Sequence, residues 1–340
     1  MSRERLIAAF VRYHGYGAAR AEPLAQDASF RRYLRLTGGP RAAVLMDAPP
    51  PEDIGPFVRI AGHLAGIGVS VPEIFAADEA EGLLLEEDLG DRLVSGWLGR
   101  PPPNPFPQGE GEGAAVMMAA VNTLLAIQRA PPPADLPAWD AAVMATTALA
   151  TLFDWWWPAM FGARAPNAVR QDIAAALEAM LAPIAAGPLG FVHRDFFAGN
   201  LLWLPQRSGI RRIGVLDFQN AAIGHPAYDL ASLLQDGRRD IPAELAERAI
   251  AHYLVARPEL DRAAFHAAYA ACAAQRHLRI VGQWVRLARR DGRPAYLMHG
   301  PRTWRLLQQA LREPATTPLR EAMDRWIPPD RRCNPPDLAA

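Results

Sequence analysis

The sequence predicts an α+β protein in which a small, strand-rich part is followed by a larger and mostly helical part. Apolar residues alternate at strand spacing in parts of the first 90 residues, whereas Ala- and Leu-rich segments with helical spacing dominate from residue 114 onward. Between the two, residues 99–113 hold too many Pro and Gly residues to continue a helix or a central strand. We therefore expect a loop or linker there, between the two parts of the chain.

The first part opens with a short helix over 4–13, whose apolar residues recur at helical spacing. Two strands, 31–36 and 42–46, follow it, and Gly38-Gly39 between them is typical of a hairpin turn. After a Pro-rich loop we expect a helix over 57–66 and two further strands at 73–78 and 83–87.

The second part is expected to contain six helices and two short strands. The strands, 189–192 and 213–216, are apolar, rich in β-branched residues and too short for globular helices. The tail, residues 327–340, is polar and Pro-rich, so loose packing is expected there. The helices are expected at 114–129, 139–153, 168–185, 243–256, 261–289 and 302–312.

The composition excludes several classes of function. Arg and Lys together number 36 and so do Asp and Glu, so no global charge favours nucleic acid or an anionic membrane. None of the 340 residues is Lys, which excludes Schiff-base chemistry and an ordinary P-loop. Half of the residues are hydrophobic, enough for a substantial core.

Cysteine usage and hydropathy indicate where such a chain resides. Cys272 and Cys333 fit neither a metal-ligand spacing nor a disulfide framework. The first ten residues lack the apolar stretch of a signal peptide, and no later run reaches the ~18 apolar residues of a spanning helix. We expect a monomeric cytoplasmic protein that binds neither nucleic acid nor membranes.

Candidate catalytic and metal-binding residues cluster next to the two short strands of the second part. Asp195 follows the first strand, Asn200 comes five residues later, and Asp217 ends the second strand. A hairpin of these two strands would bring two carboxylates and an amide oxygen together. Such hard oxygen ligands suit Mg²⁺.

Ordinary turn residues are the alternative interpretation, because Asp and Asn favour loops in any protein. The complete set in this order, next to apolar strands, favours the functional interpretation. His193 is more typical of a buried, hydrogen-bonded prop than of a proton carrier.

With His193, Asp195, Asn200 and Asp217 in this order, the chain resembles the aminoglycoside phosphotransferase family, which has the two-lobed protein-kinase-like fold. The resemblance implies that residues 1–88 bind ATP and that residues 89–340 form the catalytic and substrate-binding lobe. It implies that Asp195 accepts or orients the proton of the substrate hydroxyl, while Asn200 and Asp217 hold Mg²⁺ at the ATP phosphates. Asp229, on a following helix, would brace the catalytic loop.

Other residues are assigned to the nucleotide by the same resemblance. Glu87, Asp88 and Leu89, at the end of a strand, would meet adenine through their backbone. The segment before the strand at 31–36 would cover the phosphates through Ser29, Phe30, Arg31 and Arg32, although it lacks glycine. The alternative for this segment is a solvated strand face that carries Arg31, Tyr33 and Arg35.

The usual strand lysine of such kinases is replaced by Met46. The helix expected over 57–66 also lacks the glutamate that orients this lysine, and a buried glutamate without its cation would be costly. An arginine is therefore expected to serve the phosphates, or Mg²⁺ carries more of the charge.

Four segments resemble one bacterial branch of the family, the kinases that phosphorylate the anomeric hydroxyl of N-acetylmuramate and N-acetylglucosamine in cell-wall recycling. The resemblance implies that an amino sugar is the substrate and that it lies near Asp195 and Gln219. The segments are residues 29–33, 46–50, 87–90 and 217–219.

An arginine-rich stretch bears on the substrate independently. Residues 271–312 hold nine arginines and one acid, Asp291, and Arg276, Arg279, Arg286 and Arg290 share one helical face. Such a face in a pocket would attract a sugar carboxylate and repel a polycationic aminoglycoside. A solvated basic helix or a partner surface is the alternative.

Gln275, Gln283 and Trp284 on the same helix are candidates to bind a sugar, although Trp284 is more typical of a core. Three functions stay open at this point. They are an amino-sugar kinase, an aminoglycoside or other metabolite kinase of the same family, and a binding-only pseudokinase.

Overall fold

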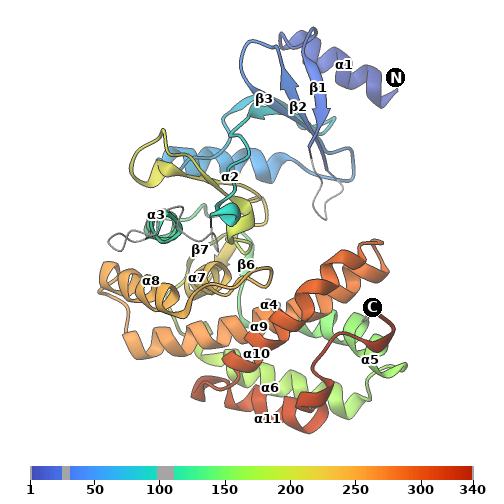
Figure 1. Cartoon of the computed structure of the whole chain (residues 1–340), viewed down its shortest axis with the longest axis vertical. Coiled ribbons are helices and arrows are strands. Elements are labelled where there is room, and N and C mark those ends of the chain that lie inside the picture. The colour runs from blue at the N-terminus through green and yellow to red at the C-terminus, as the bar shows by residue number, and fades with distance from the viewer. Residues whose placement is uncertain (1, 25–30, 98–110, 339–340) are drawn as a thin grey trace. The chain divides into compact units, whose positions relative to one another are not determined.

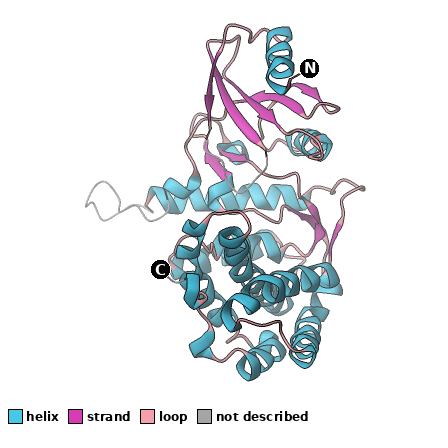
Figure 2. Cartoon of the chain, turned by 90° about the vertical axis from the view of Figure 1, so that its right-hand side faces the viewer, coloured by secondary structure: helices cyan, strands magenta, loops and turns pink. Residues whose placement is uncertain are grey.

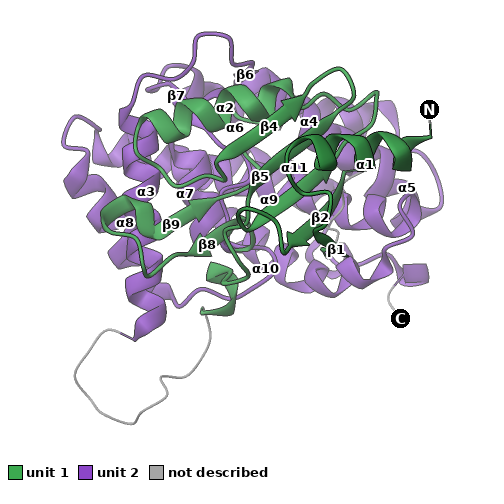
Figure 3. Cartoon of the chain, turned by 90° about the horizontal axis from the view of Figure 1, so that it is seen from above, with its two compact units in different colours: residues 1–97, 199–221 green, residues 98–198, 222–340 purple. Residues whose placement is uncertain are grey.

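The computed structural model describes residues 2–24, 31–97 and 111–338. The chain forms two compact units, which are coloured separately in Figure 3. Unit 1 consists of Met1–Trp97 and Gly199–Ala221, and unit 2 of Leu98–Ala198 and Ala222–Ala340. The first division falls at Trp97, nine residues after the expected boundary, and unit 1 also takes in a segment from the middle of the chain. The segment Gln26–Phe30, expected at the phosphates, lies outside the described residues.

Unit 1 contains a five-stranded antiparallel sheet with strand order β1-β2-β3-β5-β4. Figure 1 labels β1, β2 and β3, and Figure 3 labels β4 and β5. The expected hairpin is confirmed: β2 pairs with β3, and Gly38 between them has φ +83°, a backbone conformation that favours glycine. Two helices complete this part. The elements are α1 (Arg3–Tyr13), β1 (Arg20–Pro23), β2 (Arg32–Thr37), β3 (Ala43–Asp47), α2 (Gly55–Gly66), β4 (Ile74–Asp78) and β5 (Leu83–Glu87).

The two faces of this sheet have different environments, because neighbouring residues of a strand point to opposite sides. One face, with Leu36, Leu45 and Leu85, packs in a core with apolar residues of α1. The register places Tyr33 and Met46 side by side on the other face. Every residue of the central strand β3 is buried.

The segment Gly199–Ala221 forms a small hairpin of β8 (Leu201–Trp203) and β9 (Ile213–Val215), paired antiparallel. The Val215 amide donates to Ser70 O at 2.8 Å, which joins the hairpin to the chain after α2. The expectation that strand 189–192 pairs with strand 213–216 is wrong. That strand, β7 (Gly190–Val192), pairs with β10 (Ala222–Gly224), and the partner of β9 is the short strand that directly follows Asn200.

Unit 2 holds a three-stranded sheet, in which β10 lies between β7 and β6 (Ala138–Trp139), and most of the helices. Helices are cyan and strands magenta in Figure 2. The long helix α9 packs against α4, α7 and α10. All six expected helices are present within a few residues, and α5, α7 and α11 are additional. The helices are α3 (Glu112–Arg129), α4 (Ala141–Thr151), α5 (Trp157–Phe161), α6 (Asn167–Ala185), α7 (Ala227–Leu234), α8 (Ala243–Ala256), α9 (Arg262–Arg289), α10 (Gly300–Ala310) and α11 (Thr317–Trp326).

The tail after α11 is packed, contrary to the expectation of a loose end. Ile327 is fully buried, and Arg332 is buried against the Ile327 carbonyl and Asp324. The indole N–H of Trp156, in a π-helical turn between α4 and α5, donates to Cys333 O at 3.0 Å. Both cysteines are free thiols. None of the described helices is long and apolar enough to traverse a bilayer.

Candidate active site

A braced loop follows strand β7 in unit 2. The fully buried carboxylate of Asp229, on α7, accepts the backbone N–H of His193 at 2.6 Å and that of Arg194 at 2.9 Å. The Asp195 N–H points back to His193 Nδ1 at 3.3 Å, and the His193 side chain is fully buried. These bonds fix the backbone that leads into Asp195.

Arg194 in this loop and Asp217 in unit 1 have left-handed backbone conformations, with φ of 73° and 60°. They are the two non-glycine residues with positive φ in the part of the chain that the structure describes. Such conformations cost about 1–3 kcal/mol each and persist where surrounding contacts impose them. Both therefore mark imposed geometry within the predicted catalytic motif.

Burial raises the pKa of Asp229 to about 7, although the two backbone N–H groups favour its charged form. The same cause acts on Asp195, but there the charges of Arg279 and Arg276 outweigh burial, and the net effect lowers the pKa. Arg276 Nη1 lies 3.7 Å and Arg279 Nη2 lies 3.9 Å from Asp195 Oδ1. Asp195 is therefore ionised at neutral pH.

Helix α9 supplies these two arginines, which lie three residues apart and so on one face. Arg276 is 4% exposed, and its Nη1 also donates to the Arg194 carbonyl at 3.1 Å. The solvated-helix alternative is thus wrong for this middle part of α9. It holds for Arg290, an exposed residue that pairs with Asp291 at 2.7 Å.

The three polar residues of unit 1 that the sequence assigned to metal and substrate lie together. Asn200 Nδ2 donates to Asp217 Oδ2 at 3.3 Å, and Gln219 Nε2 donates to Asp217 Oδ1 at 2.7 Å. The backbone also joins the two ends of the β8–β9 hairpin, because the Leu216 N–H donates to Asn200 O at 2.9 Å. Phe218, between Asp217 and Gln219, is fully buried and stacks on Phe57 of α2 with ring centroids 4.6 Å apart.

This donor set fits Mg²⁺, since a carboxylate and an amide oxygen are hard ligands and the ion keeps several waters or substrate oxygens. In the described parts of the chain, no group of three or more His, Cys, Asp and Glu side chains is arranged to hold a metal.

The sheet of unit 1 separates the two arginines that were assigned to phosphates. Arg31 is 8% exposed and its Nε donates to Glu52 Oε2 at 3.1 Å, so it is not part of a solvated strand face. Arg32 and Arg3 both pair with the buried carboxylate of Asp47, which ends strand β3. Adjacent positions on an extended chain put Arg31 and Arg32 on opposite sides of the sheet.

Met46 is fully buried beside Tyr33, so the lysine position carries an apolar side chain. Burial, chiefly, raises the pKa of Tyr33; Glu86 and Asp217 add to the rise, and Arg31 opposes it. Burial also raises the pKa of Glu86 to about 8, against the charge of Arg31. Arg31, Tyr33, Glu86 and Asp217 therefore influence one another electrostatically, a grouping that the sequence did not reveal.

The strand end assigned to adenine is built into unit 1 through its side chains. Glu87 Oε1 accepts Arg207 Nη2 at 2.6 Å, and Asp88 Oδ2 accepts Arg35 Nε at 2.6 Å. A methyl group of Leu89 lies 3.1 Å from where a Cβ on Gly214 would stand. These contacts fix the strand end against the β8–β9 hairpin.

Two candidates for the sugar on α9 are used in packing. Trp284 is 3% exposed, donates to Thr303 Oγ1 at 2.9 Å and stacks on Tyr296, as its core alternative expects. Gln275 is fully buried and donates to the Met144 carbonyl at 2.7 Å. Gln283 lies partly exposed on the same helix.

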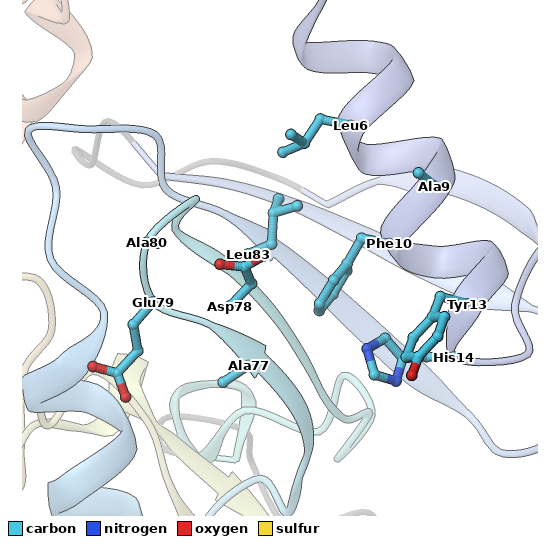
Figure 4. A pocket seen from close by; sticks show the side chains of 10 residues that line it. All are labelled: Leu6, Ala9, Phe10, Tyr13, His14, Ala77, Asp78, Glu79, Ala80 and Leu83. Atoms are coloured by element: carbon cyan, nitrogen blue, oxygen red, sulfur yellow. The ribbon is translucent and has the colours of Figure 1, made fainter. Parts of the chain in front are cut away.

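An open pocket of about 800 Å³ lies elsewhere in unit 1, between α1 and the β4–β5 turn (Figure 4). Phe10 and Tyr13 from the helix and Ala77 and Leu83 from the strands are among its lining residues. It contains none of the residues that the sequence assigned to nucleotide, metal or substrate.

Comparisons with known proteins show the family to which the chain belongs. Residues 20–266 match the model of the phosphotransferase enzyme family. A protein of Caulobacter vibrioides named N-acetylmuramate/N-acetylglucosamine kinase is 37% identical, over 97% of this chain and 98% of its own length. A protein of the same name from Pseudomonas aeruginosa is 34% identical over 88% of this chain and 87% of its own.

The fold is shared with solved structures. A choline/ethanolamine kinase family protein from Mesorhizobium loti matches with a TM-score of 0.64 and 17% identity, over 94% of this chain and 98% of its own. The expected protein-kinase-like α+β fold, with a small antiparallel sheet part and a larger helical part, is confirmed.

Proposed function

Because this chain belongs to the phosphotransferase enzyme family, we propose that it transfers the terminal phosphoryl group of ATP to the anomeric hydroxyl of an amino sugar. The sugars are N-acetylmuramate, N-acetylglucosamine or both, and the product is the sugar 1-phosphate. The names of the relatives from Caulobacter vibrioides and Pseudomonas aeruginosa support this choice of sugar. Such a product would feed nucleotide-sugar synthesis during cell-wall recycling in the cytoplasm.

One observation of the structure carries the proposal: Asp195 ends a braced loop and is kept ionised by two arginines of α9. An ionised carboxylate accepts the hydrogen bond of a sugar hydroxyl and aims the oxygen lone pair at the phosphorus. Its low pKa makes it a weak base, so it takes the proton late in the transfer. This suffices because phosphoryl transfer depends mainly on positioning and charge stabilisation.

Asp229 and His193 act as positioning residues in this scheme. Asp229 holds two successive N–H groups of the loop, and the His193 ring holds the next one. Misplacement of a reacting group by about 1 Å can lower the rate a hundredfold. The hydrogen bonds from the loop to Asp229 and His193 therefore support catalysis by keeping Asp195 in place.

Asn200 and Asp217 would hold Mg²⁺, which neutralises phosphate charge when it is bound. Gln219 is assigned to Asp217 rather than to the sugar, because its amide already donates to that carboxylate. The backbone of Glu87 to Leu89 would meet adenine.

Arg31 is assigned as the cation for the phosphates in place of the missing lysine. It belongs to the Met46 side of the sheet, and its charge acts on Tyr33 together with that of Asp217. Glu52 holds its Nε, as a carboxylate would orient a lysine in related kinases. Arg32 is excluded because it pairs with Asp47 on the other side.

A ³¹P NMR time course with purified protein, Mg·ATP and each sugar tests the proposal. A new signal split by the anomeric proton, with matching loss of ATP, is the expected result. The Asp195→Asn variant is the matched control and should give no such signal. Phosphorylation of an aminoglycoside or another hydroxyl compound but of neither sugar would refute the assigned substrate.

A further inference from the structure

Three guanidinium groups surround Asp195 in unit 2, and one carboxylate does not balance them. Arg276 and Arg279 approach Asp195 Oδ1 within 4 Å, and Arg194 is its neighbour in sequence. Arg194 lies 4.0 Å and Arg279 lies 5.8 Å from the centre of the same Trp139 ring. Burial lowers the pKa of Arg194 and so does the charge of Arg279, which shows that these two cations repel each other.

Two other acids act on these arginines, and both are already occupied: Asp236, whose charge acts on Arg276, pairs with Arg239 at 2.9 Å. The two carboxylate oxygens of Asp229 accept the N–H groups of His193 and Arg194, and burial raises the pKa of Asp229 to about 7. Positive charge therefore exceeds negative charge in a partly buried volume. Such an excess is costly unless a further anion enters.

The two arginines of α9 differ in how their donors are used. Arg276 is 4% exposed and donates to the Arg194 carbonyl, so it supports the loop. The Arg279 side chain is 19% exposed. Its guanidinium donates no hydrogen bond to any group within residues 2–24, 31–97 and 111–338. Its buried Nε has no partner there, and its Asp195 contact, at 3.9 Å, is longer than a hydrogen bond.

We infer that Arg279 is the specificity residue for an acidic acceptor and binds the carboxylate of the sugar beside Asp195. The guanidinium fork matches a carboxylate with two parallel hydrogen bonds. N-acetylmuramate carries a carboxylate and N-acetylglucosamine does not, so Arg279 adds binding energy for the first sugar alone. This inference rests on the proposed function.

The transferring phosphoryl group is the other anion that a guanidinium near Asp195 would bind. The transferred phosphoryl group is the same whichever sugar reacts, and any effect of Arg279 on the pKa of Asp195 is also the same for both sugars. The ratio of kcat/KM for N-acetylmuramate to that for N-acetylglucosamine therefore isolates the contact with the sugar carboxylate.

The test measures this ratio in the full chain and in the Arg279→Gln variant. We expect kcat/KM for N-acetylmuramate to fall on the order of ten- to a hundredfold, mainly through KM, because a charge-assisted contact is lost. For N-acetylglucosamine we expect only the smaller loss that comes from the weakened electrostatic hold on Asp195, and an unchanged Tm would show that the variant is folded. Arg279→Lys keeps the charge without the fork and should show a smaller loss with the same selectivity.

Arg289→Gln is the matched control, since it removes one charge from the same helix at an exposed site where Arg289 pairs with Asp337. It should leave both values unchanged. Equal losses for the two sugars in Arg279→Gln, or in Arg279→Lys should the first variant not fold, would overturn the inference and leave the sugar kinase intact. If the wild-type protein phosphorylates neither sugar, the proposed function fails and the inference fails with it.

Discussion

Gly282 of α9 provides a sharp test of how this helix presents its arginines. The helix passes so close to the end of α4 that a Cβ on Gly282 would lie 2.2 Å from the Thr151 carbonyl oxygen and 2.4 Å from its carbon. Ordinary contacts of a Cβ begin at 3.4 Å, so the Gly282→Ala variant lacks about 1.2 Å of space. The obstacle is backbone, which cannot rotate away as a side chain does.

We expect Gly282→Ala to destabilise the protein by about 1–3 kcal/mol, the usual cost of overpacking a core. At about 2 °C for each kcal/mol, Tm should fall by roughly 2–6 °C. The displaced helix should also move Arg276 and Arg279 relative to Asp195, so kcat should fall in the folded variant. Differential scanning calorimetry and a coupled ATP assay measure the two effects.

Gly62 of α2 provides the matched control, because a Cβ there meets no atom within 4 Å. An alanine at an open helix position is favoured over glycine by up to about 1 kcal/mol, so Gly62→Ala should raise Tm slightly. An unchanged Tm in Gly282→Ala would show that α4 and α9 separate without cost and would refute the packing argument.

Four further changes test the site. Asp195→Asn should lower kcat by at least about a hundredfold in a variant that remains folded, and near-normal turnover would contradict its role. Asp217→Ala should abolish Mg²⁺-dependent binding of ATP in calorimetry, whereas retained binding would exclude it as a metal ligand. Arg31→Gln should raise the KM for ATP about tenfold and Arg32→Gln less than about twofold, and equal effects would argue against the assignment. Burial raises the pKa of Glu86 to about 8 from its ordinary 4.5, so the folded state retains a proton that the unfolded chain releases, and stability falls as pH rises between these values. The Glu86→Gln variant should lack the contribution of Glu86 to this fall in the free energy of unfolding, on the order of a few kcal/mol, when urea unfolding is compared at about pH 5 and pH 8.

The hairpin around Gly38 and six of the helices of unit 2 could be predicted because their signals are local. Alternation of apolar residues and a glycine that permits positive φ suffice to define β2 and β3, and helical periodicity over ten or more residues suffices for α3, α6 and α9. The short strand β8 could not be predicted in the same way. Its three residues, Leu201–Trp203, carry no periodicity, and only pairing with β9 makes them a strand.

The sequence by itself indicated which polar residues form the proposed catalytic motif, since Asp195, Asn200, Asp217 and Asp229 stand in a characteristic order. Tertiary structure alone decided what surrounds them. An arginine at helical spacing is compatible with solvent or with a pocket, and the packing of α9 in unit 2 turned Arg276 and Arg279 toward Asp195. Burial and charge balance depend on contacts between segments distant in sequence, which no local pattern encodes.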